Sequence, residues 1–160
     1  MVQITKLILI HCLIFLVLFV TGQNTPAKDH LKTAIFAGGC FWCMEADFEK
    51  LPGIIEVVSG YTGGNSSNPN YKNYGKSGHI EAVRIEYEPS VINYRQLLDI
   101  FWVNIDPTDK DGQFCDRGNE YSSAVFYLTK DQQKLAAKSK TLIEQSGILG
   151  EPVKTPILKA

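Results

Sequence analysis

The sequence predicts an α/β (α+β) fold in which a single domain forms a two-layer sandwich around a ferredoxin-like βαββαβ core. Short apolar or alternating runs typical of strands are interspersed with stretches of helical periodicity, and turn-forming residues separate them. The first six expected elements follow the order strand, helix, strand, strand, helix, strand, which suits such a sandwich. A chain of 160 residues that is 44% hydrophobic is large enough for one domain core.

The first half of the domain is expected to hold three elements and a long loop. Residues 33–37 form a short apolar run typical of a buried strand. A helix at 41–50 ends where Leu51-Pro52-Gly53 stops the helical pattern. A short strand follows at 54–59. Residues 60–70 are rich in turn formers, and a loop of this length inside a compact domain is usually functional.

The second half is expected to hold two helices and three strands. Residues 80–87 alternate between apolar and polar side chains, as a half-buried strand does, whereas 94–105 carries apolar residues at helical spacing. A strand at 121–128 follows a Gly- and Asp-rich loop. The helix at 131–146 ends at a glycine suited to its C-terminus. The last strand, 153–158, contains a proline and is therefore expected at a sheet edge.

A separate segment precedes the domain. Lys6, a long apolar run and small residues at its end make 1–22 typical of a signal peptide. Residues 23–32 then form a polar linker and 33–160 form the domain. This organisation predicts an exported protein, periplasmic or secreted. The alternative is an uncleaved membrane anchor at 5–20, although the apolar run is short for a span, which needs about 20 apolar residues.

Charge and cysteine content narrow the classes of function. A formal net charge of −1 gives no basic surface of the kind that nucleic acids require. Removing the signal peptide removes Cys12 and leaves Cys40, Cys43 and Cys115, an odd number that favours at least one working thiol over a disulfide framework. These ligands are too few for a structural zinc site unless His79 joins them, so we expect no metal.

Cys40 is the strongest candidate for chemistry. The Gly38-Gly39 pair follows the first strand and hands over to a helix, which places Cys40 at the helix N-terminus. Unpaired backbone N–H groups and the positive end of the helix dipole lie there. This setting favours the thiolate, since helix N-termini lower the pKa of a cysteine below its free value of about 8.5.

Other groups narrow the reaction. Glu81 begins a strand after a glycine-containing loop, and Tyr71 and Tyr74 lie in the loop before it. Alone, each has an ordinary explanation as an exposed strand end or a surface tyrosine. Together with a thiolate, a carboxylic acid and phenols suit attack on an atom that bears an oxygen, because they can bind that oxygen and protonate it. A cysteine hydrolase is disfavoured because no clear base partner for Cys40 appears in the sequence; His79 is the only internal candidate.

Five motifs then occur in a specific order: Gly38-Gly39-Cys40-Phe41-Trp42, Gly60-Tyr61-Thr62-Gly63-Gly64, Asn68-Pro69-Asn70-Tyr71, Gly78-His79-Ile80-Glu81-Ala82-Val83 and Asp116-Arg117-Gly118-Asn119-Glu120-Tyr121. With them the chain resembles the A class of peptide-methionine (S)-S-oxide reductases over about residues 33–156. The resemblance implies that Cys40 attacks the sulfoxide sulfur of oxidised methionine. It also implies that Glu81 protonates the oxygen while Tyr71 and Tyr121 hydrogen-bond it, and that Cys40 is left as a sulfenic acid.

The same resemblance assigns Phe41 and Trp42 to an apolar pocket for the S-methyl group. Asp116 would support the site by holding the backbone or Arg117. No metal or organic cofactor is required, because a thioredoxin-like dithiol supplies the electrons. The substrate would be methionine sulfoxide, free or in proteins, and the enzyme a monomer that repairs oxidised proteins and contacts membranes only if its N-terminal segment is uncleaved.

The chain stops at Ala160, before the acidic-aromatic segment and cysteine-bearing tail with which members of this family usually continue. The thiol that resolves the sulfenic acid is therefore expected to be Cys43, in a C-x-x-C pair with Cys40, or Cys115, unless an external thiol acts directly. Two other functions stay open on the residues alone: an exported thiol–disulfide oxidoreductase that uses Cys40 and Cys43, and a non-catalytic remnant that binds oxidised methionine segments.

Overall fold

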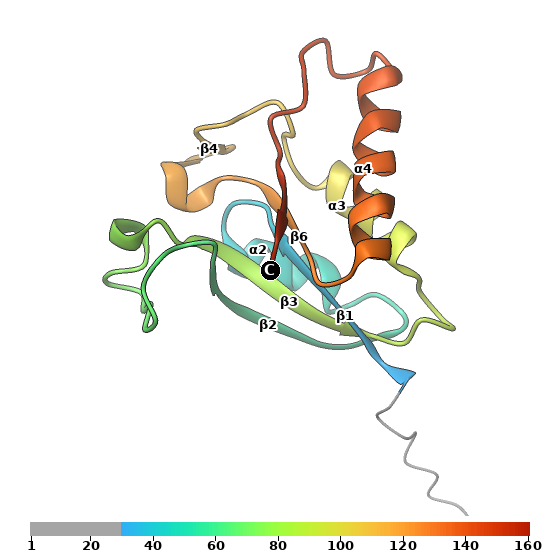
Figure 1. The fold of residues 1–160 in the computed structure, drawn as a ribbon, viewed down its shortest axis with the longest axis horizontal. Helices are drawn as coiled ribbons and strands as arrows, with labels where there is room; N and C mark the ends of the chain where they lie inside the picture. Colours follow the sequence, from blue (N-terminus) through green and yellow to red (C-terminus); the bar gives the residue numbers. More distant parts are fainter. Residues whose placement is uncertain (1–29) are drawn as a thin grey trace, which may run out of the picture.

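A five-stranded sheet forms the centre of the structure, a computed structural model that describes residues 30–160 (Figure 1). The expected signal peptide or anchor, and the linker up to residue 29, lie outside the described residues. No helix within residues 30–160 is both long and apolar enough to cross a membrane. The elements in chain order are β1 (Lys32–Ala37), α2 (Phe41–Phe48), β2 (Ile54–Thr62), the 3-10 turn η2 (Gly75–Ser77), β3 (Ile80–Tyr87), α3 (Tyr94–Val103), β4 (Gly112–Gln113), β5 (Asp116–Arg117), the 3-10 turn η3 (Asn119–Tyr121), β6 (Ala124–Tyr127), α4 (Lys130–Gln145) and β7 (Ile157–Lys159).

The strand order confirms the predicted ferredoxin-like core. The sheet runs β2-β3-β1-β6-β7. β1 pairs antiparallel with both β3 and β6, β2 pairs antiparallel with β3, and β7 adds to the edge as a parallel neighbour of β6. Each of α2 and α3 therefore links two parallel strands that have another strand between them, which is the split βαβ arrangement.

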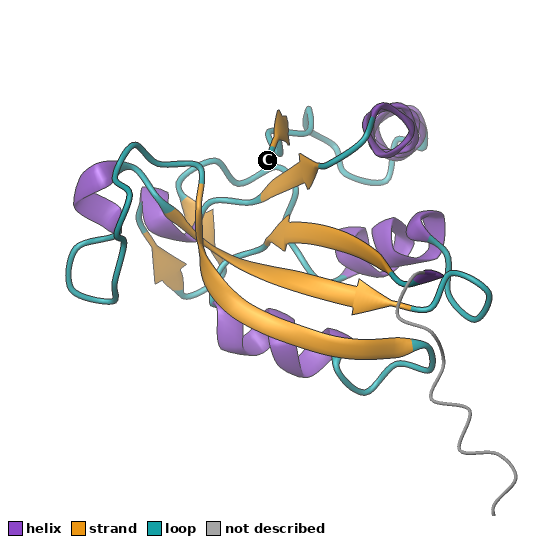
Figure 2. Ribbon diagram, turned by 60° about the horizontal axis from the view of Figure 1, so that its bottom comes forward, coloured by secondary structure: helices purple, strands orange, loops and turns teal. Residues whose placement is uncertain are grey.

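The helices α2 and α3 cover one face of the sheet (Figure 2). Because side chains alternate along a strand, Phe36 of β1 points to the helices while its neighbour Ile35 belongs to the cluster on the other face. The ring of Phe36 stacks on Phe101 of α3 with centroids 5.0 Å apart. The helix α4 packs beside α3, where Nε1 of Trp102 donates a hydrogen bond to Oγ of Ser139 at 2.8 Å.

Local sequence signals account for the helix ends. Asn93 and Gln96 form a capping box at the start of α3, and the Thr129 hydroxyl accepts the Gln132 N–H at the start of α4. Gly147 follows α4 with φ +70°, as the sequence predicts for a terminating glycine.

The helices lie within one or two residues of the predicted bounds, and three strands differ more. β2 continues through Thr62, because residues 60–62 pair with β3 rather than starting the loop. β6 begins at Ala124, so Tyr121 ends a 3-10 turn instead of opening a strand. β7 is an edge strand as predicted, but it begins only after Pro156, whose carbonyl accepts the N–H of Val125.

Candidate active site

Cys40 lies where β1 hands over to α2, at the N-cap of the helix. The carbonyl of Cys40 accepts the N–H of Met44 at 3.2 Å, the first bond of the helix. The turn before it requires glycine: Gly39 has φ +87°, and a Cβ there would lie 2.7 Å from Cβ of Gln113. The side chain of Cys40 makes no capping hydrogen bond and is partly buried. The thiol thus lies at the positive end of a helix, and its sulfur is not used to cap that helix.

Glu81, on β3, is the carboxyl group beside this helix end. It is only 2% exposed. Its Oε2 accepts the backbone N–H of Phe41, the residue after Cys40, at 2.9 Å, and its Oε1 accepts the hydroxyl of Tyr74 at 2.8 Å. A buried carboxyl group with two donors is not the solvated strand end that its position in the sequence allows. It is fixed to the helix that carries the thiol.

Aromatic rings surround these two groups. Phe41 is buried and packs against Trp42 and Tyr61, in each case with centroids 5.6 Å apart. Tyr61 stacks on Tyr74 at 4.4 Å. Trp42 and Tyr71 face each other at 6.4 Å with planes 16° apart, and both are largely exposed. The aromatic cluster therefore has a buried floor beside Glu81 and an open rim.

Tyr74 is the residue that the sequence prediction undervalues. The phenol bonded to Glu81 is Tyr74, rather than Tyr71 or Tyr121. Burial, together with the hydrogen bonds to Glu81 and Tyr121, raises the pKa of Tyr74 far above its ordinary value of 10, so the hydroxyl remains a donor at every physiological pH. Tyr61 is not among the predicted site residues, although it pairs opposite Glu81 once β2 continues into the motif at residues 60–64.

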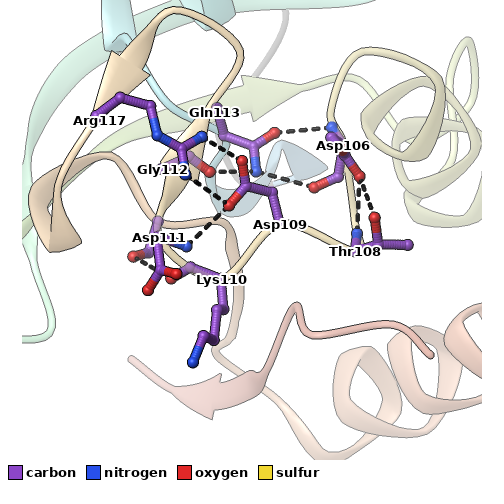
Figure 3. A network of polar contacts seen from close by, with 9 residues as sticks. Asp106, Thr108, Asp109, Lys110, Asp111, Gly112, Gln113 and Arg117 are labelled. Carbon is purple, nitrogen blue, oxygen red and sulfur yellow. Dashed lines mark hydrogen bonds and ion pairs between the residues drawn. The ribbon is translucent and has the colours of Figure 1, made fainter. Parts of the chain in front are cut away.

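Tyr121 and Asp116 come from the segment between α3 and β6. Tyr121 interacts with Tyr74, and Asp116 lies close enough to act electrostatically on Cys43 and on Tyr121. The expected support of Asp116 through Arg117 is wrong, because Arg117 pairs with Asp109 instead, with Nη2 3.2 Å from Oδ1 and a second contact from Nη1 to Oδ2 (Figure 3).

Gln113 braces this segment against the Cys40 turn. It is almost fully buried, and its amide accepts the N–H of Asp106 at 2.7 Å and donates to the Asp106 carbonyl at 2.9 Å (Figure 3). Its Cβ lies against Gly39. The loop that carries Asp116 is therefore tied to the residue next to Cys40. The sequence pattern does not predict that Gln113 supports this turn, since an isolated glutamine is usually a surface residue.

The three described cysteines are all free thiols, and two of them lie at the start of α2. Partial burial, then a hydrogen bond with Cys40 and the charge on Cys40, raise the pKa of Cys43. Cys115 is exposed at the tip of the β4–β5 hairpin. The structure thus brings Cys43 next to Cys40 and places Cys115 on a neighbouring loop.

His79 does not serve Cys40. Its Nδ1 accepts the N–H of Gly64 at 3.3 Å, and its Nε2 lies 3.0 Å from the carbonyl of Ser66, so both ring nitrogens hold the preceding loop. This removes the one internal candidate base for a cysteine hydrolase. Within residues 30–160, no group of three or more His, Cys, Asp or Glu side chains is arranged to hold a metal ion.

Comparisons with known proteins bear directly on this site. The family model described as peptide methionine sulfoxide reductase matches residues 32–160. A relative from Bacillus subtilis, named peptide methionine sulfoxide reductase MsrA, is 52% identical over 135 residues, which are 83% of this chain and 76% of the relative. One from Listeria innocua with the same name is 49% identical over the same shares.

Solved structures agree. Methionine sulfoxide reductase A of Corynebacterium diphtheriae superposes with a TM-score of 0.77 at 25% identity and covers 87% of this chain and 68% of that one. Reduced Mxr1 from Saccharomyces cerevisiae gives a TM-score of 0.75 at 29% identity, with 88% and 81% covered. Mxr1 in complex with Trx2 shares the fold, with a TM-score of 0.61 at 24% identity and 88% and 82% covered.

Proposed function

This chain belongs to the peptide methionine sulfoxide reductase family, and we propose that it reduces the S epimer with Cys40 as nucleophile and Glu81 as proton donor. Reduction of methionine sulfoxide is the activity of the family; the roles of the residues are our assignment. One contact carries it: the 2.9 Å hydrogen bond from the Phe41 N–H to Glu81 joins the carboxyl group to the residue after Cys40. An exported thiol–disulfide oxidoreductase or a non-catalytic remnant is not favoured, because the matching relatives are named as this reductase.

In the proposed reaction, the sulfur of Cys40 attacks the sulfoxide sulfur while Glu81 delivers a proton to the sulfoxide oxygen. The attack forms a transient bond between the two sulfurs, and as the oxygen passes to the sulfur of Cys40 both this S–S bond and the S–O bond of the substrate break. Cysteine is thereby oxidised by two electrons to the sulfenic acid, and the sulfoxide is reduced by two electrons to methionine. Protonation matters because an unprotonated oxygen is a poor leaving group.

The aromatic cluster orients the substrate in this proposal. Tyr74 binds the sulfoxide oxygen from the buried side, and Tyr71 and Tyr121 bind it from the exposed side. Phe41 and Trp42 hold the S-methyl group. Fixing both the methyl group and the oxygen of a chiral sulfoxide allows one epimer only to present its sulfur to the thiol.

Cys43 is the favoured resolving thiol. It contacts Cys40 within the first turn of α2. The sulfur of Cys43 attacks the sulfur of the sulfenic acid, the S–O bond breaks, and the hydroxyl leaves as water with the proton of the Cys43 thiol, which forms the Cys40–Cys43 disulfide. Cys115 and direct reduction by an external thiol are the alternatives. Counting free thiols after one turnover of the Cys43→Ser and Cys115→Ser variants separates the three.

A thioredoxin-like dithiol then reduces the disulfide, in line with the complex of Mxr1 with Trx2. The exposure of Cys43 supports access for such a donor. We further propose that residues 1–22 direct export and that the enzyme is a monomer without a metal or organic cofactor. N-terminal sequencing of the secreted protein checks the export, and its native mass in solution checks both the monomeric state and the absence of a bound metal or cofactor.

Trapping the intermediate tests the function. The Cys43→Ser variant, given methionine sulfoxide without reductant and then dimedone, is expected to release one methionine per chain and to carry the adduct on Cys40. Release of methionine by a Cys40→Ser variant would contradict the assignment.

A further inference from the structure

A groove of about 440 Å³ opens directly beside the candidate site. Three phenols, those of Tyr71, Tyr74 and Tyr121, line it. Tyr74 donates to the Glu81 carboxyl group, and Tyr71 and Tyr121 each lie against Tyr74, so the groove adjoins the site. The turns η2 and η3, which lie at the same end of the molecule, supply the rest of its lining (Figure 1).

The groove has a positive rim. Lys72 and Lys76 line it and are exposed. Among the ion pairs of residues 30–160, none involves either lysine. Glu120 is the one acidic residue of the lining, and it is held in the wall against Gly75 and Gly118. Two ammonium groups against one carboxylate leave an excess of positive charge where a ligand would enter.

The position of the groove says what would occupy it. When the sulfur of a methionine sulfoxide reaches Cys40, the rest of the substrate must leave the site past the tyrosines. A free amino acid would end at these tyrosines. A polypeptide would continue past the exposed rings of Tyr71 and Trp42, and its chain on one side of the oxidised methionine would enter the groove. A groove of this volume is large enough for flanking side chains.

We infer that this groove binds the polypeptide on one side of the oxidised methionine, and that Lys72 and Lys76 make the enzyme prefer an acidic residue there. The inference rests on the proposed function and names its substrate class: methionine sulfoxide in protein segments that carry Asp or Glu nearby. The two ammonium groups supply charge complementarity, which is stronger in a groove than on an open surface.

Matched peptides test this inference. Each peptide contains one methionine S-sulfoxide in a glycine background, with either Asp or Lys at a single flanking position. The value of kcat/KM is compared between the Asp peptide and the Lys peptide at each position. At one or more positions on one side, the wild type is expected to favour Asp by about threefold to tenfold, the size of one or two exposed charge pairs. This preference should shrink in about 1 M salt, where the screening length is about 3 Å.

Charge reversal identifies the residues. In the double variant Lys72→Glu and Lys76→Glu the preference should invert, and in Lys72→Gln with Lys76→Gln it should vanish. Lys138→Glu, on the exposed face of α4, is the matched control and should keep the wild-type ratio. Equal rates for Asp and Lys peptides in the wild type, or an unchanged ratio in the double reversal, would overturn the inference.

A small substrate separates the two proposals. Turnover of dabsyl-methionine S-sulfoxide together with a flat peptide profile would reject the groove alone. No turnover of any sulfoxide by folded wild-type protein would reject the proposed function and the inference with it.

Discussion

Glu81 and Tyr71 approach the same candidate site from two walls that are built in different ways. Glu81 projects from the central sheet, is 2% exposed and holds two hydrogen bonds, whereas Tyr71 lies in a loop and is 62% exposed. The inner wall, formed by Cys40, Glu81 and Tyr74, is thus fixed by the sandwich core. The outer wall, formed by the exposed Trp42 and Tyr71, can adapt to the substrate that it meets. In our account the inner wall performs the chemistry, and the outer wall selects the substrate.

The largest effect is expected at the inner wall. Cys40→Ser should lower kcat for methionine sulfoxide by at least about 10³-fold, because no other group takes the place of the nucleophile. Turnover with dithiothreitol measures this, and circular dichroism shows whether the fold is kept. A variant activity within tenfold of the wild type would show that Cys40 is not the nucleophile and would contradict the catalytic role of the inner wall.

Glu81→Gln should lower kcat by about 10²–10⁴-fold, the usual contribution of a general acid. The amide keeps the size of the side chain and can still accept from Phe41, so the fold should persist. Steady-state kinetics at several pH values measures the loss. A change confined to KM would mean that Glu81 only binds substrate.

Gly39→Ala tests the support of the inner wall. The positive φ and the contact of the new Cβ with Gln113 should cost about 1–3 kcal/mol in the free energy of unfolding. Gly60→Ala is the matched control, since a Cβ there meets nothing within 4 Å and its φ is not positive. Urea unfolding of both variants measures the difference, and equal stabilities would show that the turn is not constrained.

Removing the hydroxyl of Tyr74 or of Tyr71 compares the contributions of the two walls to kcat directly. Tyr74→Phe removes the buried hydroxyl bonded to Glu81 and should lower kcat by up to about tenfold, since such a hydrogen bond contributes about 0.5–1.5 kcal/mol. Tyr71→Phe removes an exposed hydroxyl and should lower it by about threefold or less. A larger loss for Tyr71 than for Tyr74 would reverse the assignment of the walls.

The smallest effect concerns the two thiols of α2. Because the pKa of Cys43 is raised, its thiolate is scarce at neutral pH and becomes common only above the ordinary range near 8.5. A short iodoacetamide pulse at pH 7 should therefore modify Cys40 before Cys43, and the gap should narrow as the pH rises. Peptide mass spectrometry reads the sites, and faster modification of Cys43 at pH 7 would contradict the assignment.

The same division explains how much the sequence could predict. The bounds of β3 and the place of Cys40 at the start of α2 follow from alternation and from the Gly-Gly turn, which are local signals. The bond between Tyr74 and Glu81 and the pairing of Arg117 with Asp109 depend on how loops fold back. Periodicity carries no information on the path of a loop, so the loop residues of the site could be named from the sequence but their contacts could not be predicted.

Gln113 shows the same limit inside the core. Its burial and its bonds to Asp106 form only when the end of α3 and the β4–β5 hairpin meet the turn before Cys40. A buried polar residue of this kind leaves no mark in the apolar pattern of the sequence, because backbone groups satisfy its hydrogen bonds. Such residues are found from a structure, and here one of them joins the β4–β5 hairpin to the turn before Cys40.

The most direct test of the account is the dithiothreitol-driven turnover of the two sulfoxide epimers of dabsyl-methionine, each supplied separately to the folded chain and to its Glu81→Gln variant. We expect the wild type to reduce the S epimer and to leave the R epimer unchanged, and the variant to lose most of the S activity. Equal reduction of both epimers, or full S activity in the variant, would contradict the proposal that Cys40 and Glu81 act together on an oriented sulfoxide.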